Sequence, residues 1–235
     1  MRSQANKLPA KKNDINSFLK KVRDVKSMTT YGSKPGRLAF IIDATASRQP
    51  TWNNAVKIQA NMFKAVEDIG TLHIQLMYFR GELEFYTSKW NVDSKSLLNE
   101  MMGVNCVAGL TQIERSLKEL LTETIKNKIS AAVYIGDAIE ETTSGIYNIS
   151  GQLGLRKTPV FMFQENYQPD VEKVFRNIAK LSGGAYCRFD SNSADLLSQL
   201  LSAVAIYAAG GHQALKVFIK NGNPQLQDMT RQLLK

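Results

Sequence analysis

Short apolar runs alternate along this chain with longer segments in which apolar residues recur every three or four positions. A short run rich in β-branched and aromatic residues is typical of a strand buried in a parallel sheet, whereas the longer spacing is typical of an amphipathic helix. The short runs predict strands at 38–42, 72–79, 131–135, 160–163 and 185–189. The segments with helical spacing predict the main helices at 52–69, 113–125, 146–153, 171–178 and 196–208.

One further strand departs from this alternation. After Gly81, the apolar residues Leu83 and Phe85 alternate with Glu82 and Glu84. The connection to the preceding strand is too short for a crossover helix, so we expect an antiparallel neighbour at the edge of the sheet. The whole pattern predicts an α/β fold: a doubly wound, mostly parallel six-stranded sheet with one antiparallel edge strand and helices on both faces, as in Rossmann-like domains.

Positive charge is concentrated at the start of the chain. The 235 residues include 30 Lys and Arg against 21 Asp and Glu, a net charge of +9. Residues 1–36 hold nine of the basic residues and two of the acidic ones, which leaves 21 basic against 19 acidic residues in the rest. We therefore expect a basic N-terminal extension with a short amphipathic helix at 1–36, one α/β domain at 37–211 and a C-terminal tail at 212–235.

The overall composition is that of an ordinary globular protein. Hydrophobic residues make up 43% and charged residues 22%, which excludes collagen-like and wholly disordered chains. Two cysteines are too few for a disulfide framework. The longest apolar tract, 200–209, is interrupted by Ser202, and no apolar stretch precedes Asp14. We therefore expect no membrane-spanning helix, no secretory signal and a cytoplasmic location.

Polar side chains gather where the predicted strands and helices meet. Asp43, Thr45 and Ser47 follow the first buried strand, Thr111 opens a helix, and Asp137 follows the strand at 131–135. Ligands of doubly wound sheets bind at the carboxyl ends of the strands, so we expect these five residues at one edge. Carboxylate and hydroxyl oxygens are hard donors that suit a hard divalent cation. Because only two of these five residues are carboxylates, they favour Mg²⁺ over Ca²⁺.

Several of these residues also have an ordinary structural explanation. Thr111 and Glu114 have the spacing of a capping box, which would account for both without a ligand. Asp137 would cap the helix that follows it. Glu140 and Glu141 precede the same helix, and we interpret them as charges that face its positive end and leave them outside the site.

The five residues, taken in order, resemble a known pattern. Asp-x-Thr-x-Ser at Asp43, Thr45 and Ser47, a Thr at position 111 and an Asp at position 137 look like the metal-ion-dependent adhesion site of von Willebrand factor A (VWA) domains. The resemblance covers roughly residues 37–209, including the antiparallel strand. It implies one Mg²⁺ or Mn²⁺ bound directly by the hydroxyls of Thr45, Ser47 and Thr111, with Asp43 and Asp137 acting largely through water.

The same resemblance implies how such an ion would be used. An open coordination position on the metal takes an acidic side chain from a partner protein, so we expect a metal-dependent protein-interaction module. Two departures from the family pattern stand out. Thr45 replaces the usual Ser and keeps the hydroxyl, whereas Ala138 follows Asp137 where Gly is usual and alters the loop.

Enzymatic alternatives have less support in the sequence. Haloacid-dehalogenase-like phosphotransferases also begin with a strand-end Asp, but they have a second Asp where this chain has Thr45. No P-loop or dinucleotide-binding glycine pattern is present. The two histidines, His73 and His212, lie outside the strand ends that a catalytic triad would use. We therefore expect no catalytic activity.

Binding of RNA through the basic N-terminus is the main alternative from another class. Its lysines and arginines would contact phosphates, but Phe18 is the only aromatic residue before Tyr31. Single-strand binders usually interleave aromatic side chains with basic ones, so nucleic acid stays the less favoured partner. The sequence specifies neither the partner protein nor the number of subunits.

Overall fold

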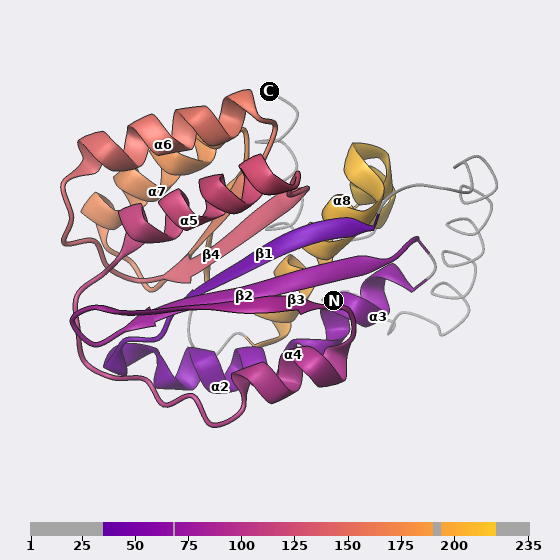
Figure 1. Cartoon of the computed structure of the whole chain (residues 1–235), viewed down its shortest axis with the longest axis horizontal. Helices are drawn as coiled ribbons and strands as arrows, with labels where there is room; N and C mark the ends of the chain where they lie inside the picture. Colours follow the sequence, from indigo (N-terminus) through magenta and orange to yellow (C-terminus); the bar gives the residue numbers. More distant parts are fainter. Residues whose placement is uncertain (1–34, 68, 190–193, 220–235) are drawn as a thin grey trace, which may run out of the picture.

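The computed structural model describes residues 35–67, 69–189 and 194–219. The amphipathic helix expected within 1–36 and the end of the tail after position 219 lie outside the described residues. What the structure describes is a sheet covered by helices on both faces (Figure 1).

The sheet has six strands in the order β3-β2-β1-β4-β5-β6. β1 pairs in parallel with β2 and β4, β4 with β5, and β5 with β6, whereas β3 pairs antiparallel with β2. The predicted fold class, including the antiparallel edge strand, is therefore confirmed. The strands are β1 Gly36–Asp43, β2 Leu72–Arg80, β3 Glu84–Asn91, β4 Ala131–Gly136, β5 Val160–Glu165 and β6 Tyr186–Phe189.

Two groups of helices cover the two faces (Figure 1). Core residues of α2, α3, α4 and α8 form one apolar cluster with the sheet, and core residues of α5, α6 and α7 form the other. The helices are α2 Gln49–Ile58, α3 Ala60–Val66, α4 Ser94–Met101, α5 Ile113–Lys126, α6 Thr143–Leu155, α7 Pro169–Ser182 and α8 Ala194–Ile219, and a short 3-10 helix, η1, spans Ala46–Arg48.

The helix expected at 52–69 is divided in two. A turn at Gln59 separates α2 from α3, although the backbone of Gln59 keeps helical angles, with φ −55° and ψ −34°. The Gln59 side chain is buried. The apolar spacing continues through this turn, which is why the sequence pattern alone predicts one helix.

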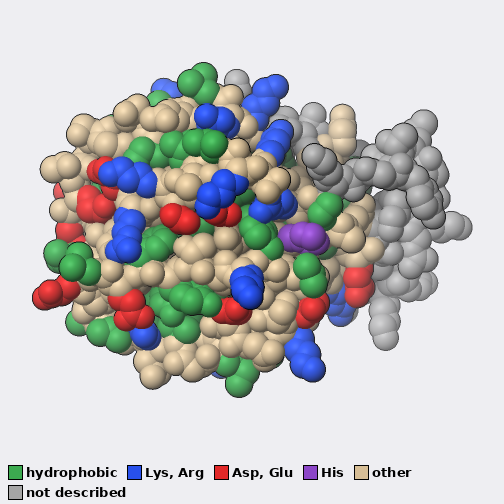
Figure 2. Space-filling view, viewed as in Figure 1, with side chains coloured by type: hydrophobic (Ala, Val, Ile, Leu, Met, Phe, Trp, Pro, Cys, Tyr) green, Lys and Arg blue, Asp and Glu red, His purple; other side chains and the backbone are tan. Residues whose placement is uncertain are grey.

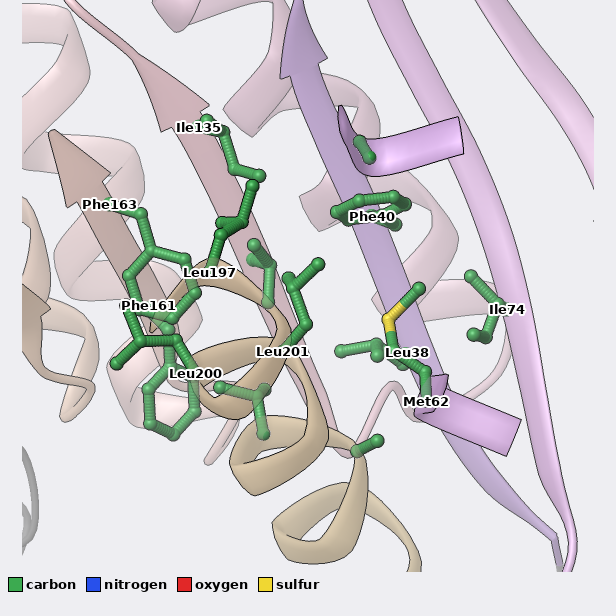
Figure 3. Close-up of a cluster of buried hydrophobic side chains, with 14 of the residues drawn as sticks. Leu38, Phe40, Met62, Ile74, Ile135, Phe161, Phe163, Leu197, Leu200 and Leu201 are labelled. Carbon is green, nitrogen blue, oxygen red and sulfur yellow. The ribbon is translucent and has the colours of Figure 1, made fainter. Parts of the chain in front are cut away.

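Helix α8 is a core helix of this domain. Leu197 and Leu200 lie on the side of Phe161 and Phe163 of β5, and Leu201 lies toward Leu38 of β1 (Figure 3). The segment Ala194–Gly211 is the one described stretch that is long and apolar enough to cross a membrane, but buried helices of soluble proteins have the same length and composition. Its buried apolar side chains pack against the sheet and against α2 and α3.

A glycine in β1 allows α8 to pack this closely. A Cβ atom on Gly36 would lie 2.5 Å from the carbonyl oxygen of Ala208. Helix α8 then continues past the non-helical Gly211, at φ 69°, as far as Ile219.

The order and direction of the central strands determine where their ends meet. β1, β4 and β5 are parallel neighbours, and Gly136 of β4 pairs with Gln164 of β5. Their carboxyl ends therefore bring Asp43, Asp137 and Glu165 to one edge of the sheet.

Candidate functional site

Asp43 is the last residue of β1 and is fully buried. Its Oδ1 atom accepts a hydrogen bond from the backbone N–H of Thr45 at 2.8 Å. Its Oδ2 atom is buried and has no hydrogen-bond partner among the described residues. The pKa of Asp43 is raised to about 6, mainly because the carboxyl is buried; the charge of Asp137 adds to the rise, whereas the hydrogen bonds from Thr45 and the charge of Arg48 oppose it. The site therefore contains a desolvated carboxylate with one oxygen unused.

The loop after β1 reaches the loop after β4. Ser47 donates a hydrogen bond from Oγ to Oδ2 of Asp137 at 3.4 Å. The Ser47 side chain is exposed and that of Asp137 is 19% exposed, so solvent reaches this contact. Thr45 is buried and precedes η1. The structure thus brings Asp43, Thr45, Ser47 and Asp137 to one edge, as the sequence predicts.

Thr111 reaches the same edge through the loop after β4. The Thr111 hydroxyl accepts a hydrogen bond from the backbone N–H of Glu140 at 3.1 Å, and the Thr111 N–H donates to Oε2 of Glu140 at 2.7 Å. These two bonds fasten the segment before α5 to the segment after Asp137. The described loops after β1 and β4 and before α5 therefore converge.

The predicted capping box at Thr111 and Glu114 is wrong. Helix α5 begins one residue later than that box requires, with Gln112 as its N-cap and no side-chain cap from Gln112. Glu141 supplies the cap from another loop, because its carboxylate accepts hydrogen bonds from the N–H groups of Ile113 at 2.5 Å and Glu114 at 2.9 Å. Such a cap satisfies amides that the first helical turn leaves without partners.

The interpretation of Glu140 and Glu141 as charges facing the helix that follows them is also wrong. The carboxylate of Glu141 accepts hydrogen bonds from the first two amides of α5, and that of Glu140 accepts one from Thr111 just before α5, a helix that precedes both residues in the chain. Sequence reasoning assigned them to the helix that follows them in the chain, whereas their hydrogen bonds are made at and just before the start of α5.

Two charged residues of the site were missed by the sequence analysis. Arg48 ends η1, and its side chain is only 2% exposed. Its Nη1 atom lies 3.1 Å from Oδ2 of Asp137, and its Nη2 atom forms an ion pair with Glu165 and donates to Oγ1 of Thr51 at 3.2 Å. Thr51 also donates a hydrogen bond to Oε2 of Glu165.

Glu165 follows the same rule that identified Asp43 and Asp137. It is the last residue of β5, and its side chain is 1% exposed. A search for acidic residues at every predicted strand end would have found it. Arg48 had no such signal, because an Arg in a loop is usually solvated.

The donor set suits a hard divalent cation. The converging loops provide carboxylate and hydroxyl oxygens, which are the donors that Mg²⁺ prefers. The unused Oδ2 of Asp43 would gain a favourable interaction from a nearby cation. Among the residues that the structure describes, no group of three or more His, Cys, Asp or Glu side chains forms a metal-binding cluster. The fit therefore rests on hydroxyls as well as carboxylates.

Comparison with known proteins identifies the fold. No family model and no curated protein sequence matches this chain. Among solved structures, the SpRpn10 VWA domain is 10% identical with a TM-score of 0.54, over 76% of this chain and 98% of that domain. The ArnB paralog VWA2 from Sulfolobus acidocaldarius is 12% identical with a TM-score of 0.52, over 74% of this chain and 46% of that protein.

A pilus protein has the same fold. The PilB minor pilin from Streptococcus sanguinis is 10% identical with a TM-score of 0.59, over 83% of this chain and 65% of that protein. This chain thus matches less than two thirds of the pilin and of the archaeal protein. The strand order, the antiparallel edge strand and these likenesses agree: the chain has the fold of a von Willebrand factor A domain.

Proposed function

We propose that this chain is a protein-interaction module that binds Mg²⁺ or Mn²⁺ and, through the ion, an acidic side chain of a partner protein. The observation that carries the proposal is the unpaired Oδ2 atom of the buried Asp43. A desolvated carboxylate without a full set of partners is costly, and a cation at this edge would offset the cost.

The neighbouring residues define how the ion would be held. The hydroxyls of Thr45, Ser47 and Thr111 are neutral ligands, and Asp43 and Asp137 would act through water, as the family pattern implies. Neutral direct ligands leave most of the positive charge on the ion, and the bound ion supplies an electrophilic position for an incoming carboxylate. The Ser47–Asp137 and Thr111–Glu140 hydrogen bonds hold together the three loops that carry these residues: the loop after β1, the loop before α5 and the loop after β4.

The likeness to other proteins supports an interaction role in general terms. The PilB minor pilin, a pilus adhesin named SpaC from Lactobacillus rhamnosus GG and the SpRpn10 VWA domain share the fold. Two of these proteins are, by name, a minor pilin and a pilus adhesin. We extend a general role in protein interaction to this chain as part of the proposal.

We propose in addition that the chain is not an enzyme. We expect purified protein with Mg²⁺ to hydrolyse neither ATP nor simple phosphomonoesters above a blank that contains the metal alone. Turnover that disappears in Asp43→Asn would instead support an Asp-dependent phosphotransferase.

Nucleic acid is the less favoured partner for the face of the domain that Figure 2 shows. In Figure 2, Lys and Arg side chains on the visible face lie among Asp and Glu side chains. A nucleic-acid site needs a basic patch or stripe on one face, and this face has mixed charge instead.

Thermal unfolding of the full chain during a Mg²⁺ titration tests the metal site. Ligand binding to the native state stabilises it by RT ln(1 + [L]/Kd), about 2.7 kcal/mol at a concentration of 100 Kd. We expect the melting temperature to rise with Mg²⁺ in the wild type and to stay constant in Thr45→Val and Asp43→Ala.

Thr122→Val provides the matched control. Thr122 is exposed on α5 and donates only to a carbonyl of its own helix, so this variant should respond to Mg²⁺ as the wild type does. An equal response of Thr45→Val, Asp43→Ala and the wild type would show that the ion binds elsewhere.

A further inference from the structure

A guanidinium lies among the carboxylates of the proposed metal site. The Arg48 side chain is 2% exposed, and it contacts Asp137 of the β4 loop and Glu165 of β5. Arg48 therefore joins the ends of three strands, because its own loop begins at the end of β1.

The charges of this group add up to a value that a divalent ion would balance. Asp43, Asp137 and Glu165 carry three negative charges when ionised, and Arg48 carries one positive charge, which gives a net charge of −2. Without Arg48 the same edge would carry −3. The guanidinium thus removes one unit of the negative charge that attracts a cation.

The contact between Arg48 and Asp137 is the weaker of its two ion pairs. Nη1 lies 3.1 Å from Asp137 Oδ2 but makes no hydrogen bond to any described residue. On the other side, Nη2 is bound to both Glu165 and Thr51, which also bond to each other. Arg48 is therefore anchored at Glu165, while its contact with Asp137 depends mainly on charge.

The Oδ2 atom of Asp137 therefore has several partners that compete for it, of which Arg48 is one. The same oxygen accepts the hydrogen bond from Ser47, and a metal held by Ser47 and Asp137, directly or through water, would draw on it too. A cation beside this oxygen and the guanidinium of Arg48 would repel each other while they share one carboxylate.

We propose that Arg48 is the internal counter-cation of this site: it stabilises the metal-free domain and weakens metal binding by competing for Asp137. This inference rests on the proposed metal site and concerns its regulation. The consequence is a domain that stays folded without its ion and binds the ion more weakly than the oxygen donors alone would.

The test must avoid leaving a buried charge unpaired. Arg48→Met alone would remove the positive charge beside Glu165, which is 1% exposed, and removing one partner of a buried ion pair is strongly destabilising. We therefore compare Glu165→Gln with the double variant Arg48→Met/Glu165→Gln. In both, position 165 is neutral, so the two variants differ only in the guanidinium.

Two measurements are made on full-length protein: the Kd of Mg²⁺ by titration calorimetry and the free energy of unfolding in urea with chelator. We expect the double variant to bind Mg²⁺ at least about tenfold more tightly than Glu165→Gln, since it lacks a unit positive charge beside a divalent ion. Lys126→Met, which removes the cation of a surface pair with Glu123 at the other end of α5, should bind Mg²⁺ as the wild type does.

A further variant covers the case in which the double variant does not fold. Arg48→Lys keeps the charge but offers a single ammonium, which cannot contact Asp137 and Glu165 in the bidentate manner of a guanidinium. We expect it to bind Mg²⁺ a few-fold more tightly than the wild type and to unfold at lower urea when metal-free. Unchanged Mg²⁺ affinity in this variant would overturn the inference.

The outcomes separate this inference from the proposed function. If the wild type binds Mg²⁺ and the double variant binds no more tightly than Glu165→Gln, only the role of Arg48 is wrong. If the double variant alone binds Mg²⁺, Arg48 takes the place of the ion and the metal-dependent function is wrong for the native chain. If none of the proteins binds Mg²⁺, both are overturned.

Discussion

Replacing Asp43 with Asn should stabilise the metal-free domain near neutral pH. Burial raises the pKa of Asp43 from 3.8 to about 6 in the folded state, so the fold favours the protonated carboxyl. The ionised carboxylate begins to cost stability as the pH rises above about 4, and the full cost is present above pH 6. A difference of about two pKa units corresponds to about 3 kcal/mol.

The expected result is a difference that depends on pH. With chelator, Asp43→Asn should exceed the wild type in free energy of unfolding by up to about 3 kcal/mol at pH 7, and the difference should vanish near pH 4. Saturating Mg²⁺ should reverse the order at pH 7, because the ion stabilises only the protein that carries the carboxylate. Urea unfolding followed by tryptophan fluorescence, using Trp52 and Trp90, measures both series.

Asp93→Asn is the control for Asp43→Asn, because it makes the same exchange of a carboxylate for an amide elsewhere in the domain. Asp93 caps α4 by accepting a hydrogen bond from Ser96 N–H at 2.7 Å, and Asn is about as good an N-cap as Asp, so no gain in stability is expected. If metal-free Asp43→Asn is no more stable than the wild type at pH 7, Thr45 and Arg48 already compensate the carboxylate, and the argument for a cation fails.

Three further substitutions, two of them paired with a control substitution, test the structure around the site and in the core by urea unfolding, with a Mg²⁺ titration added for the first. Gly109→Ala should destabilise the domain and lower its Mg²⁺ affinity, because the added Cβ would lie 1.8 Å from a carbonyl oxygen of the β2–β3 turn. The control is Gly151→Ala in α6, whose added Cβ meets nothing within 4 Å, so it should be neutral or stabilising by up to about 1 kcal/mol. Leu200→Ala, fully buried in α8, should cost about 2 to 5 kcal/mol, and Leu155→Ala, 87% exposed, far less. Glu141→Gln should cost about 0.5 to 2 kcal/mol by weakening the cap of α5.

The fold could be predicted because its signals are local and repeated. Each central strand is a short apolar run, and each main helix has a continuous apolar face. The short link after β2 also required the antiparallel strand β3, which the structure confirms. The turn at Gln59 was missed because the backbone keeps helical angles there and the apolar spacing continues through it.

The site could be predicted only in part, because most of its contacts join distant segments. Strand-end positions identified Asp43 and Asp137, and the structure brings their loops together. The pairing of Arg48 with Glu165 spans 117 residues, so neither the burial of the guanidinium nor its partner follows from local pattern. The same holds for Glu141, whose cap on α5 depends on which loops meet in space.

Anomalous diffraction from crystals of the full chain grown with Mn²⁺ tests the central claim most directly. The account predicts one anomalous peak at the carboxyl edge of the sheet, about 2.0 to 2.2 Å from hydroxyl oxygens of Thr45, Ser47 or Thr111. It also predicts that the guanidinium of Arg48 moves away from Asp137 and keeps its ion pair with Glu165. A clear map without a peak at this edge, with Arg48 still against Asp137, would contradict it.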